Sequence, residues 1–267
     1  MKAKQLDQFY TNPLIAKKCI DLLEEHIPKA QRQYYIEPSA GTGSFSSQLK
    51  NCVSVDIDPK FKGVHKADFL LLAKNDLIEK KVKTSAICVI GNPPFGKNSS
   101  LAVKFFNHSA SMGDTIAFIL PKTFRKKSIH NKLNKNFWLV VDIDLPKDSF
   151  IHADQPHDTP CCFQVWERRA EAREKIEFKF SEFVEFVPKS EASFAVRRVG
   201  GRAGRAISDF APCAEVSHHF LRVKKGNIKT IVNAINAIDF SEIVNSTAGV
   251  RSLSKGELLE KLNEVLK

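Results

Sequence analysis

The chain has 267 residues, 43% of them hydrophobic and 27% charged, which excludes intrinsic disorder as the default and suits one large core or a core with a small appendage. Its formal net charge of +11 favours a polyanionic partner, because lysine and arginine placed against phosphates release counterions and add affinity. The opening residues lack the apolar segment of a signal peptide, and no later stretch reaches the roughly 18 apolar residues of a membrane span, so we expect no membrane association and a cytoplasmic or, in a eukaryote, nuclear location.

The six cysteines are scattered along the chain without the paired CxxC spacing of zinc sites. We therefore expect reduced, mostly buried thiols and neither a metal site nor a disulfide framework. The positions are Cys19, Cys52, Cys88, Cys161, Cys162 and Cys213.

Helix-like and strand-like segments alternate from about residue 12 to 165. Apolar residues on a helical period predict helices, and short runs rich in β-branched residues predict buried strands. The predicted helices cover residues 13–27, 44–50, 99–111 and 124–136. The predicted strands cover residues 33–39, 52–58, 86–90, 115–121, 138–145 and 161–167. This alternation predicts an α/β domain whose mostly parallel sheet binds ligands at the carboxyl ends of its strands.

The pattern changes after residue 167. Residues 196–206, VRRVGGRAGRA, crowd four arginines and three glycines into a short segment. Residues 254–267 predict a helix that begins with a capping box of Ser254 and Glu257. We expect a core domain over residues 1–167 and a small α+β appendage over residues 168–267.

A glycine-containing turn stands between the first predicted strand and the helix after it, in residues 36–46, IEPSAGTGSFS. Gly41 and Gly43 permit a tight turn and a close approach of the backbone to a ligand. The third glycine of the dinucleotide fingerprint GxGxxG is missing. Glu37 would repel a pyrophosphate, and it suits a ligand that carries an amine.

Two further acidic positions follow predicted strands. Asp56, in VDID, lies where a carboxylate can accept from both hydroxyls of a ribose. Asp68 and Phe69 come where a third strand should end, and an acceptor beside an aromatic face fits the exocyclic amine and the plane of an adenine.

The apolar strand at residues 86–90 runs directly into GNPPFGK at residues 91–97. Because proline removes a ladder hydrogen bond, two in succession end the strand and lock the backbone. We therefore expect the groups of this turn to be held rigidly at the end of the strand.

The set QFYT (8–11), EPSAGTGSF (37–45), VDID (55–58), ADF (67–69) and NPPF (92–95) resembles the S-adenosylmethionine-dependent amino-methyltransferases that modify adenine N6 in nucleic acids. The glycine motif precedes NPPF and the extra segment follows both, which resembles the γ order of DNA adenine methyltransferases. The resemblance covers roughly residues 8–166. It implies a Rossmann-like class I methyltransferase fold with a mostly parallel seven-stranded sheet, in which residues 168–267 are a possible nucleic-acid contact region.

Residue by residue, the resemblance implies S-adenosylmethionine as cofactor. The implied cofactor contacts are Tyr10, Thr11, Glu37, Ala40, Gly41, Gly43, Asp56, Asp68 and Phe69. It also implies that the Asn92 side-chain oxygen and the Pro93 carbonyl accept the two N–H bonds of the adenine amine, with Pro94 keeping the turn rigid. Phe95, where many family members carry tyrosine, would stack on a base that must be flipped out of a duplex. Phe150 is a weaker candidate for a second stacking ring.

Two groups of basic residues are candidates for phosphate contact. One is the arginine–glycine cluster of Arg197, Arg198, Arg202 and Arg205. The other follows a strand end on the predicted substrate side and consists of Lys122, Arg125, Lys126 and Lys127. DNA and RNA remain equal alternatives, and a protein partner or a second copy of the chain could supply selectivity. Two other functions stay open: methylation of a protein glutamine at N5, which the same Asn-Pro-Pro carbonyls could hold, and nucleic-acid binding by a relative that has lost catalysis.

Overall fold

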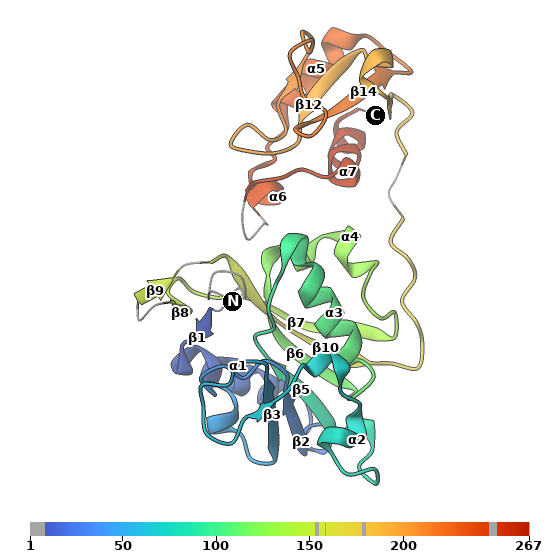
Figure 1. Ribbon diagram of the computed structural model, residues 1–267. Coiled ribbons are helices and arrows are strands. Elements are labelled where there is room, and N and C mark those ends of the chain that lie inside the picture. Colours follow the sequence, from blue (N-terminus) through green and yellow to red (C-terminus); the bar gives the residue numbers. More distant parts are fainter. Residues whose placement is uncertain (1–8, 153–154, 158, 178–179, 246–249, 267) are drawn as a thin grey trace. The chain divides into compact units, whose positions relative to one another are not determined.

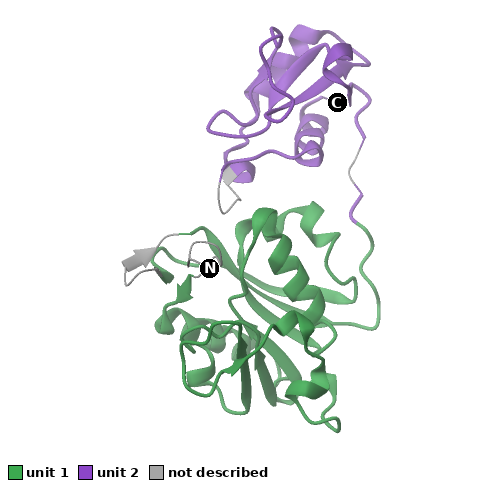
Figure 2. Ribbon diagram, viewed as in Figure 1, with its two compact units in different colours: residues 1–175 green, residues 176–267 purple. Residues whose placement is uncertain are grey.

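The protein consists of two compact units, residues 1–175 and 176–267, shown in different colours in Figure 2. Each unit has its own hydrophobic core. The computed structural model describes residues 9–152, 155–157, 159–177, 180–245 and 250–266. Gln8 of the QFYT stretch therefore lies outside the described residues.

The division between the units falls after Lys175, whereas the sequence placed it after residue 167. Strand β10 (Cys161–Arg168) continues past that point. The backbone N–H groups of Arg169 and Arg173 then donate to carbonyls of the loop that precedes β7 (Phe137–Asp144). These bonds hold residues 169–173 against the rest of the first unit.

A seven-stranded sheet forms the centre of the first unit, in the order β4-β3-β2-β5-β6-β10-β7 (Figure 1). Its strands are β2 (Tyr34–Glu37), β3 (Cys52–Asp56), β4 (His65–Lys66), β5 (Ile87–Gly91), β6 (Thr115–Pro121), β7 (Phe137–Asp144) and β10. β10 runs antiparallel to both of its neighbours, and the pairings among β2 to β6 are parallel. This confirms the predicted α/β fold with a mostly parallel seven-stranded sheet.

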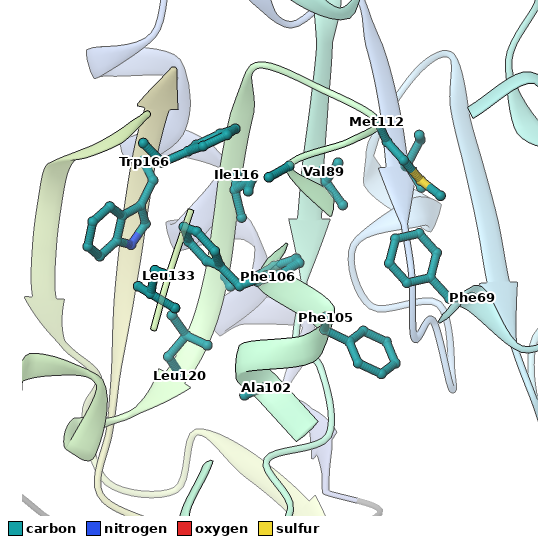
Figure 3. Close-up of a cluster of buried hydrophobic side chains, with 14 of the residues drawn as sticks. Phe69, Val89, Ala102, Phe105, Phe106, Met112, Ile116, Leu120, Leu133 and Trp166 are labelled. Carbon is teal, nitrogen blue, oxygen red and sulfur yellow. The ribbon is translucent and has the colours of Figure 1, made fainter. Parts of the chain in front are cut away.

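Each face of this sheet is apolar, because its central strands are buried on both sides. All seven residues of β6 are buried. Ile116, Phe118 and Leu120 pack into one core with helix α3 (Ser100–Ser109), as Figure 3 shows for part of that cluster. Ala117 and Ile119 belong to the other core, to which helix α1 (Pro13–His26) contributes.

The helices of the first unit are shorter than the sequence predicted. Residues 124–136 form only single turns, because asparagine side chains there bind backbone amides: Asn134 Oδ1 accepts from Asn136 N at 3.0 Å. The α-helices of this unit are α1 (Pro13–His26), α2 (Lys74–Leu77), α3 (Ser100–Ser109) and α4 (Lys127–His130). Single turns of 3₁₀ helix occupy Lys29–Gln31, Ser46–Gln48, Phe69–Leu71, Thr84–Ala86, Lys97–Ser99 and Lys122–Arg125.

A small antiparallel sheet of β1 (Tyr10–Thr11), β8 (Phe150–His152) and β9 (Gln155–His157) joins distant parts of the chain. Thr11 pairs with Phe150, and the Thr11 carbonyl accepts from Ser44 Oγ at 2.6 Å. The segment before α1 is thereby fixed beside the glycine turn.

The second unit is an antiparallel four-stranded sheet with helices, in the order β11-β14-β12-β13. Its elements are β11 (Val184–Phe186), a 3₁₀ turn (Lys189–Glu191), β12 (Phe194–Arg197), β13 (Ala206–Ile207), β14 (His218–Val223), α5 (Ile228–Ala237), α6 (Ser241–Asn245) and α7 (Lys255–Val265). The predicted capping box of Ser254 and Glu257 is confirmed at the start of α7. Within the part of the chain that the structure describes, every helix is too short or too polar to span a membrane.

Candidate functional site

A cavity of about 210 Å³ opens where β2, β3 and β5 end at their carboxyl edge. A second hollow of about 30 Å³ adjoins it through shared lining residues. Of the residues predicted from sequence, these line one or both: Tyr10, Thr11, Glu37, Ala40, Gly41, Asp56, Asp68, Phe69, Asn92, Pro93, Pro94 and Phe95. Tertiary structure thus brings segments from residue 10 to residue 95 to one place.

The glycine turn after β2 leaves no room for side chains. Gly41 has φ +49°, and a Cβ there would lie 2.9 Å from the ring of Tyr10. Gly43 has φ +76°, and a Cβ there would lie 2.4 Å from the ring of Phe61. Gly43 does not line either cavity; it shapes the turn whose Gly41 faces the cavity.

Glu37, the last residue of β2, is a buried carboxyl that is 2% exposed. Burial raises its pKa to about 7, although hydrogen bonds from Ser46 and from the Phe45 amide act in the opposite direction. Ser46 N donates to Glu37 Oε2 at 2.9 Å. A cationic group bound beside this carboxyl would favour its ionised form and lower its pKa.

Asp56 ends β3 with both oxygens engaged by backbone amides. Oδ2 accepts from Gly41 N and Oδ1 from Asp58 N, each at 2.7 Å. Since a carboxylate oxygen has two lone pairs, each can still accept from a ligand hydroxyl. The bond to Gly41 also ties the glycine turn to β3.

Asp68 and Phe69 also line the cavity. Asp68 Oδ1 accepts from Leu70 N at 3.0 Å and so caps a 3₁₀ turn, while the carboxyl remains exposed. The Phe69 ring is 1% exposed and stacks on Phe105, with the ring centroids 5.5 Å apart. A planar ligand would meet a rigid aromatic edge and one exposed acceptor here.

Asn92 follows β5 with its side-chain amide held in one orientation. Asn92 Nδ2 donates to the Phe9 carbonyl at 3.0 Å, and only the NH₂ end of an amide can make that bond. Ser39 Oγ donates to the Asn92 carbonyl at 2.9 Å. Asn92 Oδ1 is left buried, with no hydrogen-bond partner among the described residues. A buried acceptor without a partner is costly, so this one points to a ligand that donates.

Phe95 lines the same cavity two residues after Pro93. Its ring is partly exposed, and its carbonyl accepts from Leu101 N and Ala102 N, both at 3.2 Å. The start of α3 therefore fixes the backbone that carries this ring.

Phe150 lies away from the cavity, contrary to its expected place as a second stacking ring. It is 0% exposed and belongs to the apolar core, where its ring meets that of Phe9 edge-on at 6.5 Å. Its pairing with Thr11 on β1 turns the ring inward.

Lys122 and Arg125 are neutralised by carboxylates of β7, whereas the sequence offered them as cations for phosphate. Lys122 Nζ lies 2.6 Å from Asp144 Oδ2, and Arg125 binds Asp142 through two nitrogens, the closest contact being 2.7 Å. Hydrogen bonding from Lys122 and Arg125 also lowers the pKa of Asp144. Arg197, Arg198 and Arg202 belong to the second unit.

The lining residues that the sequence did not single out include Phe9, Ser39 and Phe105. Phe9 acts through its backbone carbonyl, which no sequence pattern marks. Ser39 was visible in EPSAG, but its bond to the Asn92 carbonyl depends on how β2 and β5 pair. Among the described residues, no group of three or more His, Cys, Asp or Glu side chains could hold a metal ion.

The similarities to known proteins are distant and come from solved structures. No protein-family model matches the chain, and no curated protein matches it. Among solved structures, a proposed RNA methyltransferase from Pyrococcus horikoshii is similar at 17% identity and a TM-score of 0.48, over 63% of this chain and 90% of that one. A proposed class I S-adenosylmethionine-dependent methyltransferase from Listeria monocytogenes gives 16% and 0.45, over 62% and 64%. The 23S rRNA methyltransferase ErmE gives 15% and 0.41, over 61% and 71%. Each of these TM-scores is below 0.5, so the similarities carry no argument, and function is argued below from the site.

Proposed function

We propose that the protein transfers a methyl group from S-adenosylmethionine to the N6 amino group of adenine in DNA or RNA. The observation that carries this proposal is the buried, unpartnered Oδ1 of Asn92 at the edge of the cavity. An acceptor held in this way fits a substrate that donates an N–H bond at a fixed position.

The residues around the cavity fit the three parts of S-adenosylmethionine. Glu37 would attract the amino group, Asp56 would accept from the ribose hydroxyls, and Asp68 with Phe69 would bind the adenine. Gly41 would allow close approach, since any larger residue would collide with Tyr10. When bound, S-adenosylmethionine supplies a methyl group on a positively charged sulfur, which is transferred as the C–S bond breaks and leaves a neutral thioether.

The chain's own contribution to the chemistry is to hold the acceptor amine. The exocyclic nitrogen of adenine is a weak nucleophile because its lone pair is delocalised into the ring. Asn92 Oδ1 and the Pro93 carbonyl would accept its two N–H bonds and draw the nitrogen toward tetrahedral geometry. The lone pair then forms the new N–C bond, and the nitrogen passes one proton to solvent. This is positioning and electrostatic preorganisation, and no strong base is required.

The surrounding residues would keep the target base in place. Phe95 offers a partly exposed ring at the cavity for stacking, and a base in a duplex must first be flipped out of the helix. The protein's net charge of +11 favours a polyanionic substrate over a protein glutamine, whose amide the same two acceptors could hold.

Methyl transfer from radiolabelled S-adenosylmethionine tests the proposal. The substrates are matched single-stranded DNA, duplex DNA, structured RNA and a protein extract, with adenine-free versions of each nucleic acid as controls. We expect label in N6-methyladenine and none in the adenine-free controls. Label on protein alone would indicate that the substrate is a protein glutamine. Cofactor binding without any label would indicate a binding protein that lacks catalysis.

A further inference from the structure

The arginine-rich segment of the second unit forms a rigid hairpin turn between β12 and β13, which we call the arginine hairpin (residues 197–205). Two backbone hydrogen bonds close its ends: Arg197 N donates to the Arg205 carbonyl, and Gly204 N donates to the Arg197 carbonyl, both at 2.8 Å. Val196 and Ala206 pair across the strands that flank it. The sequence alone could not distinguish such a turn from a solvated loop.

Packing against α5 and Phe240 holds the arginine hairpin in place. Asn236 clamps Ala206, since its Oδ1 accepts from Ala206 N at 2.9 Å and its Nδ2 donates to the Ala206 carbonyl at 3.1 Å. Gly204 has φ +99°, and a Cβ there would lie 2.5 Å from the Phe240 ring. Arginines carried on such a turn lose less backbone entropy on binding than they would on a flexible tail.

The arginine hairpin carries four positively charged side chains, Arg197, Arg198, Arg202 and Arg205. In the described part of the chain, none of its four arginines forms an ion pair with a carboxylate. Arg197, Arg202 and Arg205 line a hollow of about 530 Å³ together with His218. Arg222, on the neighbouring strand β14, differs because Glu185 and Glu191 bind it at 2.9 and 3.0 Å.

A second hollow of about 500 Å³ adjoins the first through His218 and extends the basic surface. Lys189, Arg198 and Lys255 line it, with Glu215 as the acidic residue among them. Arg198 Nε is buried and has no hydrogen-bond partner among the described residues. Burial, with help from Arg198 and Lys255, lowers the pKa of His219 to about 4, as expected in a positive environment.

We propose that the arginine hairpin and the adjoining hollow bind the phosphodiester backbone of a nucleic acid. Two neighbouring hollows suit an extended polyanion better than a single small anion, and the planar guanidinium group matches phosphate oxygens in pairs. The proposal rests on the proposed function for its choice of nucleic acid over other polyanions. The second unit then binds the backbone of the substrate without reading its sequence.

Binding of the full chain to fluorescent oligonucleotides, measured by anisotropy without cofactor over a range of salt concentrations, tests this site. The probes are single-stranded DNA, single-stranded RNA and duplex DNA of one sequence. Arg202→Gln and Arg205→Gln change exposed positions and leave the hairpin hydrogen bonds intact. Each variant should reduce the magnitude of the slope of log K against log salt by about 0.7 on single strands, which lowers the affinity about fivefold near 0.1 M salt. The double variant should lower the affinity about 25-fold.

Arg222→Gln is the matched control, because it removes one charge from the same unit where carboxylates already neutralise it. It should leave both slope and affinity close to those of the unchanged protein. The tightest of the three probes identifies the source of the backbone. The proposal is overturned if no probe binds, or if the double variant behaves like Arg222→Gln on every probe. Because methyl transfer is not measured, failure of the proposed chemistry would leave this result standing.

Discussion

Replacing Asn92 with alanine should separate catalysis from stability. The change removes one hydrogen bond, from Asn92 Nδ2 to the Phe9 carbonyl, which is worth about 0.5–1.5 kcal/mol net. It also removes the buried Oδ1, whose lack of a partner costs about 1–3 kcal/mol in the protein without ligand. These terms oppose each other, and the second is larger by about 1 kcal/mol at the midpoints, so the free energy of unfolding should stay unchanged or rise by about 1 kcal/mol.

The effect of the same substitution on rate should be large. Removing one preorganised hydrogen-bonding group from an active site costs about 10²–10³ in kcat, or about 2.7–4 kcal/mol. Cofactor affinity should change little, because Asn92 is assigned to the substrate amine. We expect Asn92→Ala to fold, to bind S-adenosylmethionine in calorimetry and to lose nearly all methyl transfer.

Asn107→Ala provides the matched control for this experiment. Asn107 is satisfied at both ends: Nδ2 donates to the Lys132 carbonyl at 2.9 Å, and Oδ1 accepts from Asn134 N at 2.8 Å. Losing both bonds should lower stability by about 1–2 kcal/mol and leave activity unchanged. Chemical denaturation and initial rates of methyl transfer give both quantities. The reasoning is refuted if Asn92→Ala loses as much stability as Asn107→Ala and retains activity.

Three further predictions concern the cavity and the core beside it. Burial raises the pKa of Glu37 from 4.5 to about 7, so between these two pH values the folded chain without cofactor keeps a proton that the unfolded chain has lost. The free energy of unfolding therefore falls as the pH rises from 4.5 to 7. Glu37→Gln should therefore lose less stability than the unchanged protein from pH 4.5 to 7 in denaturation experiments, and identical pH profiles would contradict this. Phe95→Ala should raise the KM for nucleic acid by the loss of stacking worth about 1–3 kcal/mol per base, while Phe95→Tyr keeps the ring and should bind as before; equal KM values for all three would rule out stacking. Phe150→Leu should lower the unfolding free energy by about 1 kcal/mol without changing that KM, because Phe150 is fully buried, and the opposite pattern would restore it as a substrate contact.

The sequence predicted most of the first unit, because strands buried on both faces are nearly continuous runs of apolar residues. The observed β6 (Thr115–Pro121) coincides with the predicted strand, and β10 extends one residue beyond it. Residues 124–136 failed as a long helix for a local reason that competes with periodicity, namely that Asn134 Oδ1 accepts a hydrogen bond from the nearby backbone amide of Asn136. Helical spacing of apolar residues does not reveal that competition.

The residue types and the order of the candidate site were determined by the sequence alone. Gly41 and Asn92 follow predicted strands, Asp56 lies at the end of another, and Phe69 comes where a further strand was expected to end. Parallel strands deliver their carboxyl ends to one edge of a sheet. That rule makes the meeting of these residues predictable without any coordinates.

Only the tertiary structure decided which hydrogen-bond or ion-pair partner each of these side chains has, because the partner lies far away along the chain. The carbonyl that orients Asn92 belongs to Phe9, 83 residues earlier, and the carboxylates that neutralise Lys122 and Arg125 come from β7, which is separated from β6 in the sheet by the antiparallel strand β10. Such partners depend on strand order and register, which the pattern of one segment does not contain. A sequence can therefore show which groups gather at a site, but the long-range pairing of the backbone decides which of them remain free to act.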